Sequence, residues 1–477
     1  MTPSAESRRA PGHGTFAAVL LLAYAGLVVW NAAHHAMWRD EIQAWLLVRD
    51  SADLAALLHN MRYEGHPVLW HLVIWPLARF GRDPGLMQIP NVAFAVAAVA
   101  LVLWRAPLDR REMVLFPFGF FVFFEYAGKS RSYALGMMLT FAACALWPGR
   151  REHPVRLAAV LALLANAHLL FAIVSGAFAA AVLVDRIGSR GWERPGRWEV
   201  IAAVLLAAGW AVAVAAAWPA ADAVHGRAAL GLGPDRLISE IGAIAGLIGP
   251  YDSLASTLIG LALLTATFVV IRREPAAVTL LALVTGLVFM LFLLAYVSNV
   301  WHRGVLFLAV FAALWIARLS PAAAPQARGP VGRLVLVTLL AAQLASALWA
   351  LWIEAGRPLS AGRAVARHIA AQGWAGDPLV GSPDYAVSTV VGYLGIPRAY
   401  YGNVGRWGSF TLWDRAREQV RDAAAMLEAA DGLPRPTTLV TTEPIGAALA
   451  GRYGYREIAR FDGASNPTER YVLYRRD

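Results

Sequence analysis

Cysteine, lysine and charge of either sign are all scarce in this sequence of 477 residues. The one cysteine, Cys144, lies inside an apolar stretch, which excludes an intramolecular disulfide and says little about the redox compartment. Charged residues make up only 16% of the chain and hydrophobic residues 58%, a balance that excludes a soluble protein of this length. The composition therefore predicts a polytopic α-helical membrane protein.

The basic charge does not indicate a nucleic-acid partner. Lys129 is the only lysine, and the arginines that supply the rest of the formal charge of +10 mostly occupy short loops between apolar segments. Arginines in such loops set the topology of a membrane protein. The chain also lacks an internal repeat and a G-x-x-x-x-G-K-[ST] phosphate loop, so we expect no bound nucleotide.

About eleven membrane spans are expected, because roughly 20 apolar residues cross the hydrocarbon core. They lie near 15–33, 85–104, 113–127, 133–147, 157–167, 168–184, 200–218, 251–271, 276–297, 304–318 and 334–353. The segment 157–167 is too short to cross alone, so we expect it to stop part-way and line a cavity. The first segment follows Arg8 and Arg9 but has no small-residue cleavage site, which favours an uncleaved helix over a signal peptide.

The apolar segment 68–80 is assigned to a helix that lies against the membrane without crossing it. With that choice, the loops on the side of the N-terminus are much richer in arginine than those on the other side, as the positive-inside rule requires. A crossing helix at 68–80 would invert this bias. The assignment predicts a cytoplasmic N-terminus and a first outer loop at 34–84.

The chain changes character near residue 356. Helical runs at 361–372 and 412–430 alternate with short strand-like runs at 378–381, 437–441 and 471–474. This alternation indicates a small α/β domain. We therefore divide the chain into a transmembrane catalytic module, 1–355, and an extracytoplasmic C-terminal domain, 356–477.

An adjacent pair of acids, Asp40 and Glu41, follows the first span. On a helix, consecutive side chains point about 100° apart, so one acid would face a cavity as a base while the other orients it or helps to bind a metal. A helix N-cap at Asp40 is the alternative explanation. We favour function, because charged groups at membrane level are costly and tend to be functional.

Other polar residues come from separate segments that this topology places on the same outer face. They are Glu64, His66, Lys129, Arg131, Tyr133, His168, His302 and Arg303. Carboxylates can accept a proton and cations can hold a phosphate. For four of them a structural role is the alternative. His66 could be a hydrated residue at the start of a helix, and Lys129 a charged residue of a loop between spans. His168 could be a packed core residue, and Arg303 an anchor at the membrane interface.

Two stretches of the first outer loop carry a family resemblance. Trp38-Arg39-Asp40-Glu41, followed by Tyr63-Glu64-Gly65-His66-Pro67-Val68-Leu69-Trp70, resembles the corresponding loop of the GT-C glycosyltransferases, above all the bacterial protein O-mannosyltransferase and aminoarabinose transferase group. Val68 stands where that group has a second proline. Lys129-Ser-Arg131-Ser-Tyr133 resembles the Ala-Arg-x-Tyr/Asp-x-Leu segment after the third span. The likeness covers about 15–185, and the later spans match only in kind.

The resemblance implies a GT-C-like enzyme of the bacterial inner membrane that moves a sugar from a polyprenyl-phosphate donor to an extracytoplasmic protein, lipid or glycan. Asp40 would be the general base, and Arg131, Lys129, His302 and Arg303 would stabilise the departing phosphate. Some relatives hold a divalent metal ion, for which Glu41 and His66 are candidate ligands. The other partners of such an enzyme would be membrane lipids.

Three other functions compete with this interpretation. A transporter or lipid flippase should show polar or broken helices near the bilayer midplane and paired repeats, whereas the charges of this sequence cluster at the outer edge. An O-antigen-type polymerase or ligase would rely on large late outer loops. A catalytically dead relative with a binding tail would tolerate the replacement of Asp40.

Overall fold

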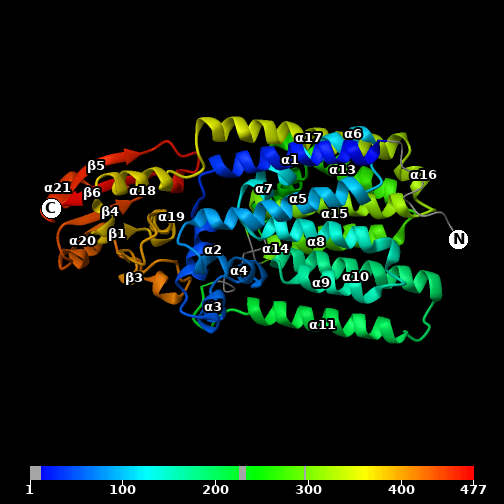
Figure 1. Ribbon diagram of the computed structural model, residues 1–477, viewed down its shortest axis with the longest axis horizontal. Coiled ribbons are helices and arrows are strands. Elements are labelled where there is room, and N and C mark those ends of the chain that lie inside the picture. Colours follow the sequence, from blue (N-terminus) through cyan, green and yellow to red (C-terminus); the bar gives the residue numbers. More distant parts are fainter. Residues whose placement is uncertain (1–11, 225–232, 295–296) are drawn as a thin grey trace.

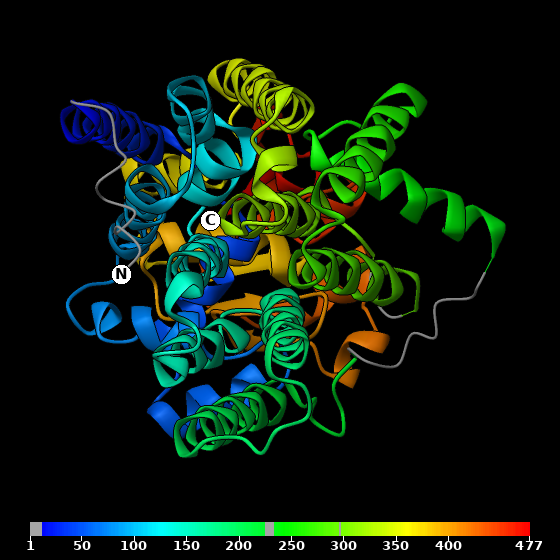
Figure 2. The ribbon, with the colours of Figure 1, turned by 90° about the vertical axis from the view of Figure 1, so that its right-hand side faces the viewer.

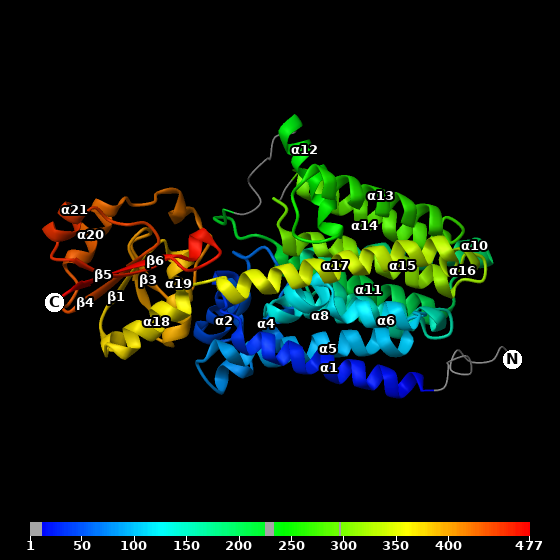
Figure 3. The same ribbon diagram turned by 90° about the horizontal axis from the view of Figure 1, so that it is seen from above.

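The computed structural model describes residues 12–224, 233–294 and 297–477, which form two parts. A bundle of long helices is capped at one end by a smaller α/β domain, formed by the C-terminal part of the chain (Figure 1). The first helix begins at the opposite end of the bundle (Figure 3). The start of α1 and the C-terminus therefore lie at opposite ends of the molecule.

Nine helices in the described ranges are long and apolar enough to cross a membrane. They are α1 (His13–His34), α5 (Gln88–Arg105), α8 (Ser132–Leu146), α10 (Leu169–Arg190), α11 (Arg197–Ala217), α13 (Leu254–Ile271), α14 (Pro275–Leu294), α15 (Val300–Leu319) and α17 (Pro330–Gly356). Viewed end-on, α15 lies within the bundle and α1 and α11 lie at its rim (Figure 2). The chain is a multi-pass helical membrane protein, as its composition predicted.

One of the eleven expected spans takes another form, and another is the short helix that was expected. The segment predicted at 113–127 is broken into α6 (Arg110–Leu115), a π-helical stretch (Phe120–Glu125) and α7 (Tyr126–Gly128). Pro117, which has no N–H to donate, and the extended backbone of Gly119 end the first piece. The short segment expected at 157–167 is α9 (Pro154–Ala165), and three residues separate it from α10.

Short helices lie between the bundle and the C-terminal domain (Figure 3). They are α2 (Arg39–Asp50), α3 (Leu54–Met61) and α4 (Leu69–Ile74), while α12 (Pro234–Gly242) and α16 (Ala324–Ala327) lie elsewhere. The helix expected over 68–80 is shorter than predicted. It consists of α4 and a single 3-10 turn at Leu77–Arg79, separated at Pro76.

The C-terminal domain contains a six-stranded mixed sheet of order β3-β2-β1-β4-β6-β5. Its strands are β1 (Leu379–Ser382), β2 (Ala399–Tyr401), β3 (Arg406–Gly408), β4 (Thr437–Thr441), β5 (Arg456–Phe461) and β6 (Tyr471–Arg476). Its helices are α18 (Gly362–Ala371), α19 (Asp384–Leu394), α20 (Ala423–Asp431) and α21 (Ala447–Arg452). Strand β1 runs parallel to β2 and β4, and the remaining pairs are antiparallel.

The strand-like runs at 378–381, 437–441 and 471–474 correspond to β1, β4 and β6. The helix predicted over 412–430 forms only in its second half. Asp422 starts α20 by accepting a hydrogen bond from the backbone N–H of Ala425 at 2.8 Å, and residues before it form an irregular segment.

Helix α2 shares a hydrophobic core with the C-terminal domain. Ile42 and Trp45 are fully buried in one cluster with Val387 and Val391 of α19. The two helices approach so closely that a Cβ atom on Gly392 would lie 2.4 Å from Cγ2 of Ile42. The C-terminal domain therefore holds α2 in place.

This contact predicts a large difference between two glycine substitutions in the same domain. Gly392→Ala should lower the free energy of unfolding by about 1–3 kcal/mol, because the added methyl group overpacks the interface with α2. Gly451→Ala, where a Cβ meets nothing within 4 Å, is the matched control and should be neutral or slightly stabilising. Thermal unfolding in detergent measures both, and equal unfolding temperatures would contradict the proposed close packing.

Candidate functional site

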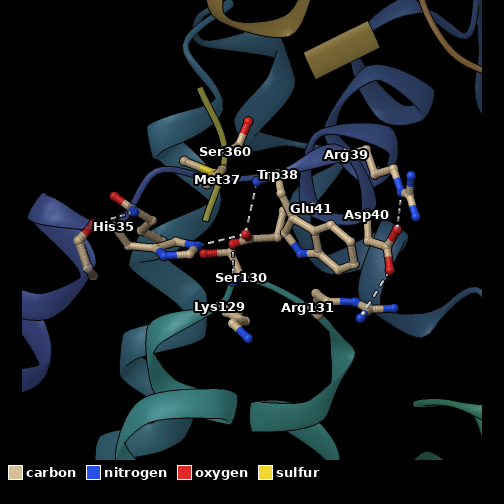
Figure 4. Close-up of polar contacts among 12 residues, drawn as sticks. His35, Met37, Trp38, Arg39, Asp40, Glu41, Lys129, Ser130, Arg131 and Ser360 are labelled. Carbon is tan, nitrogen blue, oxygen red and sulfur yellow. Dashed lines mark hydrogen bonds and ion pairs between the residues drawn. The ribbon is translucent and has the colours of Figure 1, made fainter. Parts of the chain in front are cut away.

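The two neighbouring acids of the first turn of α2 have different surroundings (Figure 4). Glu41 is fully buried: its Oε1 accepts a hydrogen bond from the backbone N–H of Ser130 at 2.6 Å, and its Oε2 lies 2.8 Å from Nε2 of His35. The Asp40 side chain is 28% exposed. Glu41 also accepts a bond from the backbone N–H of Trp38 at 3.3 Å, so it is Glu41, and not Asp40, that satisfies the helix start.

His35 links three helices behind the acid pair. Its ring is buried, with Nδ1 2.6 Å from Oε1 of Glu354 in the last turn of α17. Burial alone would lower the pKa of His35, but the carboxylates of Glu41 and Glu354 outweigh it and raise the pKa to about 10. The imidazolium therefore ties the ends of α1 and α17 to the start of α2.

Asp40 lies beside two guanidinium groups. Its Oδ2 is 3.3 Å from Nη1 of Arg131, and its Oδ1 is 3.7 Å from Nε of Arg39 (Figure 4). The Arg131 guanidinium also lies over the rings of Tyr133 and Trp301, 5.2 Å from each centroid. Arginine held in this way presents a fixed positive charge next to a partly exposed carboxylate.

Lys129 belongs to the same loop but carries its own counter-ion. Its Nζ lies 2.5 Å from Oε2 of Glu125, at the end of the π-helical stretch. The helix is interrupted near Pro117, and the stretch that follows places both charges at the end of the bundle that meets the C-terminal domain. The sequence segment around Lys129 was expected at the site, whereas Glu125 was not among the expected residues.

Two cavities meet at Asp40 and Arg131, with volumes of about 390 and 660 Å³. Both are also lined by Arg39, Tyr385 and Trp413. The first cavity extends along the bundle past Glu64, His66, His168, Trp70, Leu170 and Leu291. The second extends toward the C-terminal domain past Lys129, Trp301, His302, Ser465, Asn466 and Thr468. Asp40 therefore lies on the wall that the two cavities share.

Glu64, His66 and His168 line the first cavity, and Tyr133 packs against His168. Oε1 of Glu64 accepts a hydrogen bond from Gln43 at 2.8 Å, and burial raises the pKa of Glu64 to about 7. The rings of His66 and His168 lie 4.4 Å apart, and the Tyr133 hydroxyl is 3.4 Å from Nε2 of His168. His168 precedes α10, so the short helix α9 does end at a cavity.

His302 and its neighbour Arg303 point to different places. The His302 ring lines the second cavity, with Nε2 2.9 Å from the indole N–H of Trp301. Arg303 lines neither cavity and pairs with Asp252, whose Oδ1 is 2.5 Å from Nη1. Consecutive helical residues diverge by about 100°, so the structure does not bring Arg303 to the site where the sequence placed it.

The expected metal ligands are not brought together. The Glu41 carboxylate is paired with the His35 ring and accepts a hydrogen bond from the backbone N–H of Ser130. His66 packs against His168. Within the described ranges, no group of three or more His, Cys, Asp and Glu side chains is placed to hold a metal ion. The residues that the structure describes therefore do not form a metal site.

Several site residues have no signal in the sequence. Tyr385 and Trp413 belong to the C-terminal domain, and Glu354 is 319 residues from its partner His35. Their positions follow from the docking of the C-terminal domain on α2. The spacing of residues in the sequence does not predict this docking. Of these three residues, only Glu354 could have been predicted from the sequence, because it is a carboxylate at the end of a membrane span.

Comparison with known proteins finds similarity in structure alone. No protein-family model matches the sequence, and no curated protein sequence matches it. The crystal structure of ArnT from Cupriavidus metallidurans bound to undecaprenyl phosphate superimposes with a TM-score of 0.56 over 98% of each chain, at 12% identity. Arabinofuranosyltransferase AftD from Mycobacteria matches with a TM-score of 0.37 at 14% identity, over 97% of this chain and 40% of AftD. The chain therefore has the GT-C fold, in the form that ArnT shows over its whole length.

Proposed function

We propose that this chain is a membrane glycosyltransferase that moves a sugar from a polyprenyl phosphate to an acceptor on the extracytoplasmic side of the membrane. The observation that carries the proposal is the position of the Asp40 carboxylate, on the wall between two cavities and 3.3 Å from Arg131. A base between two substrate sites is what a single-displacement transfer needs. The fold shared with ArnT, whose structure contains undecaprenyl phosphate, supports the same class of donor.

The first cavity suits the donor lipid. Apolar side chains from α4, α10 and α14, including Trp70, Leu170 and Leu291, form the part of its wall that lies against the spanning helices. An isoprenoid chain gains free energy by burying its surface among such groups. The phosphate would then lie near Arg131, at the polar end of the cavity.

The reaction follows from this arrangement. Asp40 takes the proton of an acceptor hydroxyl while that oxygen attacks the anomeric carbon of the donor sugar. The bond between the anomeric carbon and the phosphate oxygen breaks, and its electron pair stays on the departing polyprenyl phosphate. Arg131, with Lys129 of the same loop, stabilises the negative charge that develops there. A single displacement inverts the configuration at the anomeric carbon.

Transport or lipid flipping accounts less well for the same residues. The acid pair and its arginine lie at α2 and the loop before α8, at the end of the bundle beside the C-terminal domain (Figure 1). A transporter would instead place its binding groups near the middle of the membrane.

A transfer assay tests the proposal. The purified protein in lipid vesicles is supplied with a panel of radiolabelled polyprenyl-phosphate sugars and a crude cell-envelope acceptor. Transfer of label from one donor to an acid-stable product, absent with empty vesicles, is expected. Failure of every donor with an acceptor fraction from the source cells would contradict the transferase.

The carboxyl group of Glu64 predicts a pH dependence of donor binding. Its pKa of about 7 means that the side chain gains a negative charge in the first cavity as the pH rises from about 6 to about 8. This charge repels the donor phosphate, so the KM for the donor should rise several-fold over that range. In Glu64→Gln the KM should stay flat. Steady-state kinetics measures both, and an identical rise in the variant would assign the titration to another group.

A further inference from the structure

We infer that the second cavity is a sugar-binding site in which Tyr385 and Trp413 of the C-terminal domain form an aromatic platform for the acceptor. The acceptor hydroxyl would then belong to a carbohydrate and not to a protein side chain. This inference rests on the proposed function for the step that follows binding. It goes further by assigning a ligand class to a cavity and to two residues that no motif marks.

The platform is a pair of nearly parallel rings. The planes of Tyr385 and Trp413 differ by 17°, and their centroids lie 6.3 Å apart. Both residues line both cavities, so the rings lie where the cavities meet. The guanidinium of Arg39, which neighbours Asp40 in sequence, lies 4.9 Å from the Tyr385 centroid. The platform is therefore next to the proposed base.

A charged group packs against both rings and holds them in position. The Arg417 guanidinium lies 4.4 Å from the centroid of Trp413 and 5.8 Å from that of Tyr385. The same arginine is paired with the buried carboxylate of Asp384, which also accepts a hydrogen bond from Asn403 at 2.9 Å. Such support fixes the ring faces before a ligand binds, which lowers the entropy that binding must overcome.

Beside the positively charged Arg39, Lys129 and Arg131, the second cavity also offers neutral hydrogen-bonding groups. Asn299 comes from the start of α15, and Ser465, Asn466 and Thr468 come from the loop between β5 and β6. The hydroxyl oxygen of Thr468 accepts a hydrogen bond from Nη1 of Arg39 at 3.0 Å. This bond connects the loop to the first turn of α2. Hydroxyl and amide groups of this kind can both donate and accept, as the hydroxyl groups of a sugar also do.

A carbohydrate matches the aromatic and neutral polar part of this lining better than a prenyl chain or a cation does. Sugar rings present C–H faces that stack on aromatic side chains and hydroxyl edges that need polar partners. A prenyl chain would need aliphatic walls, yet among the described residues Leu359 is the only aliphatic side chain that lines this cavity. A cationic ligand would need carboxylates, and the one carboxylate here, Asp40, already faces Arg39 and Arg131. The volume of about 660 Å³ is that of a small-molecule site.

Binding without donor tests this inference separately from catalysis. Full-length protein in detergent is applied to an array that carries neutral hexose and pentose oligosaccharides beside peptides rich in serine and threonine. We expect wild type to bind a set of saccharides, and Trp413→Leu to lose about tenfold or more in affinity for them. Trp413→Phe, which keeps an aromatic face, should recover most of the binding.

Trp407→Leu is the matched control, because Trp407 is a partly exposed tryptophan of the same domain that lines neither cavity. It should bind like wild type, and all variants should unfold at similar temperatures. Binding of the peptides in place of the saccharides, no saccharide binding, or saccharide binding unchanged in Trp413→Leu would each overturn the sugar site. Saccharide binding without transfer from any donor would overturn the proposed function and leave the sugar site standing.

Discussion

Asp40→Asn should lower the rate of sugar transfer by at least about a hundredfold, because the amide cannot take the proton of the acceptor hydroxyl. The substitution keeps the size of the side chain, and the 28% exposed position leaves little packing to lose. We therefore expect the variant to unfold at nearly the wild-type temperature. Initial rates of transfer at saturating donor, together with thermal unfolding in detergent, measure the two effects.

The exposed acid Asp462 in the C-terminal domain provides the control for Asp40. Asp462→Asn removes one negative charge from the same protein at a position that lines neither cavity. It should transfer sugar at the wild-type rate. Equal rates for Asp40→Asn and Asp462→Asn would show that Asp40 is not the base.

Glu41→Ala should show a different pattern, with a large loss of stability. The substitution leaves His35 charged and short of a partner and leaves the backbone N–H of Ser130 without its acceptor. Removing one member of a buried ion pair costs about 3–5 kcal/mol. Unfolding in increasing denaturant measures the loss. Glu41→Gln, which keeps an acceptor oxygen, should lose less, and a stable Glu41→Ala protein would contradict the structural role of the acid.

The same network predicts how stability changes with pH. The pKa of His35 is about 10 in the folded protein against an ordinary value of 6.5, so the folded state holds its proton more tightly. The stability that this proton contributes is complete below about 6.5 and is lost as the pH rises toward about 10. Wild type should thus unfold at lower temperature as the pH increases over that window, and Glu41→Ala should show a flatter dependence.

The architecture could be predicted from the sequence because the hydrophobicity and charge of each segment indicate whether it spans the membrane. Apolar runs of span length and the excess of arginine in alternate loops do not depend on tertiary contacts. The broken segment between Arg110 and Gly128 was missed as a break because its residues are as apolar as those of a continuous span. Only Pro117 and Gly119 mark the interruption, and membrane helices often tolerate both.

The structure brings some of the expected site residues together and leaves others apart, for a physical reason. Asp40, Arg131, Lys129 and His302 follow or begin helices at one end of the bundle, so topology alone gathers them. Arg303 was misplaced because hydropathy gives the end of a helix but not the direction of each side chain. Tyr385 and Trp413 depend on the docking of a domain far along the chain, which residue spacing does not encode.

One experiment with vesicles separates chemistry from transport. The protein is reconstituted with the active labelled polyprenyl-phosphate sugar and its acceptor, and the sugar joined to acceptor and the polyprenyl phosphate released are measured in the same sample. We expect the two products to form in equal amounts with wild type and to fall together in Asp40→Asn. Movement of intact donor across the bilayer without release of polyprenyl phosphate, unchanged in Asp40→Asn, would contradict the glycosyltransferase.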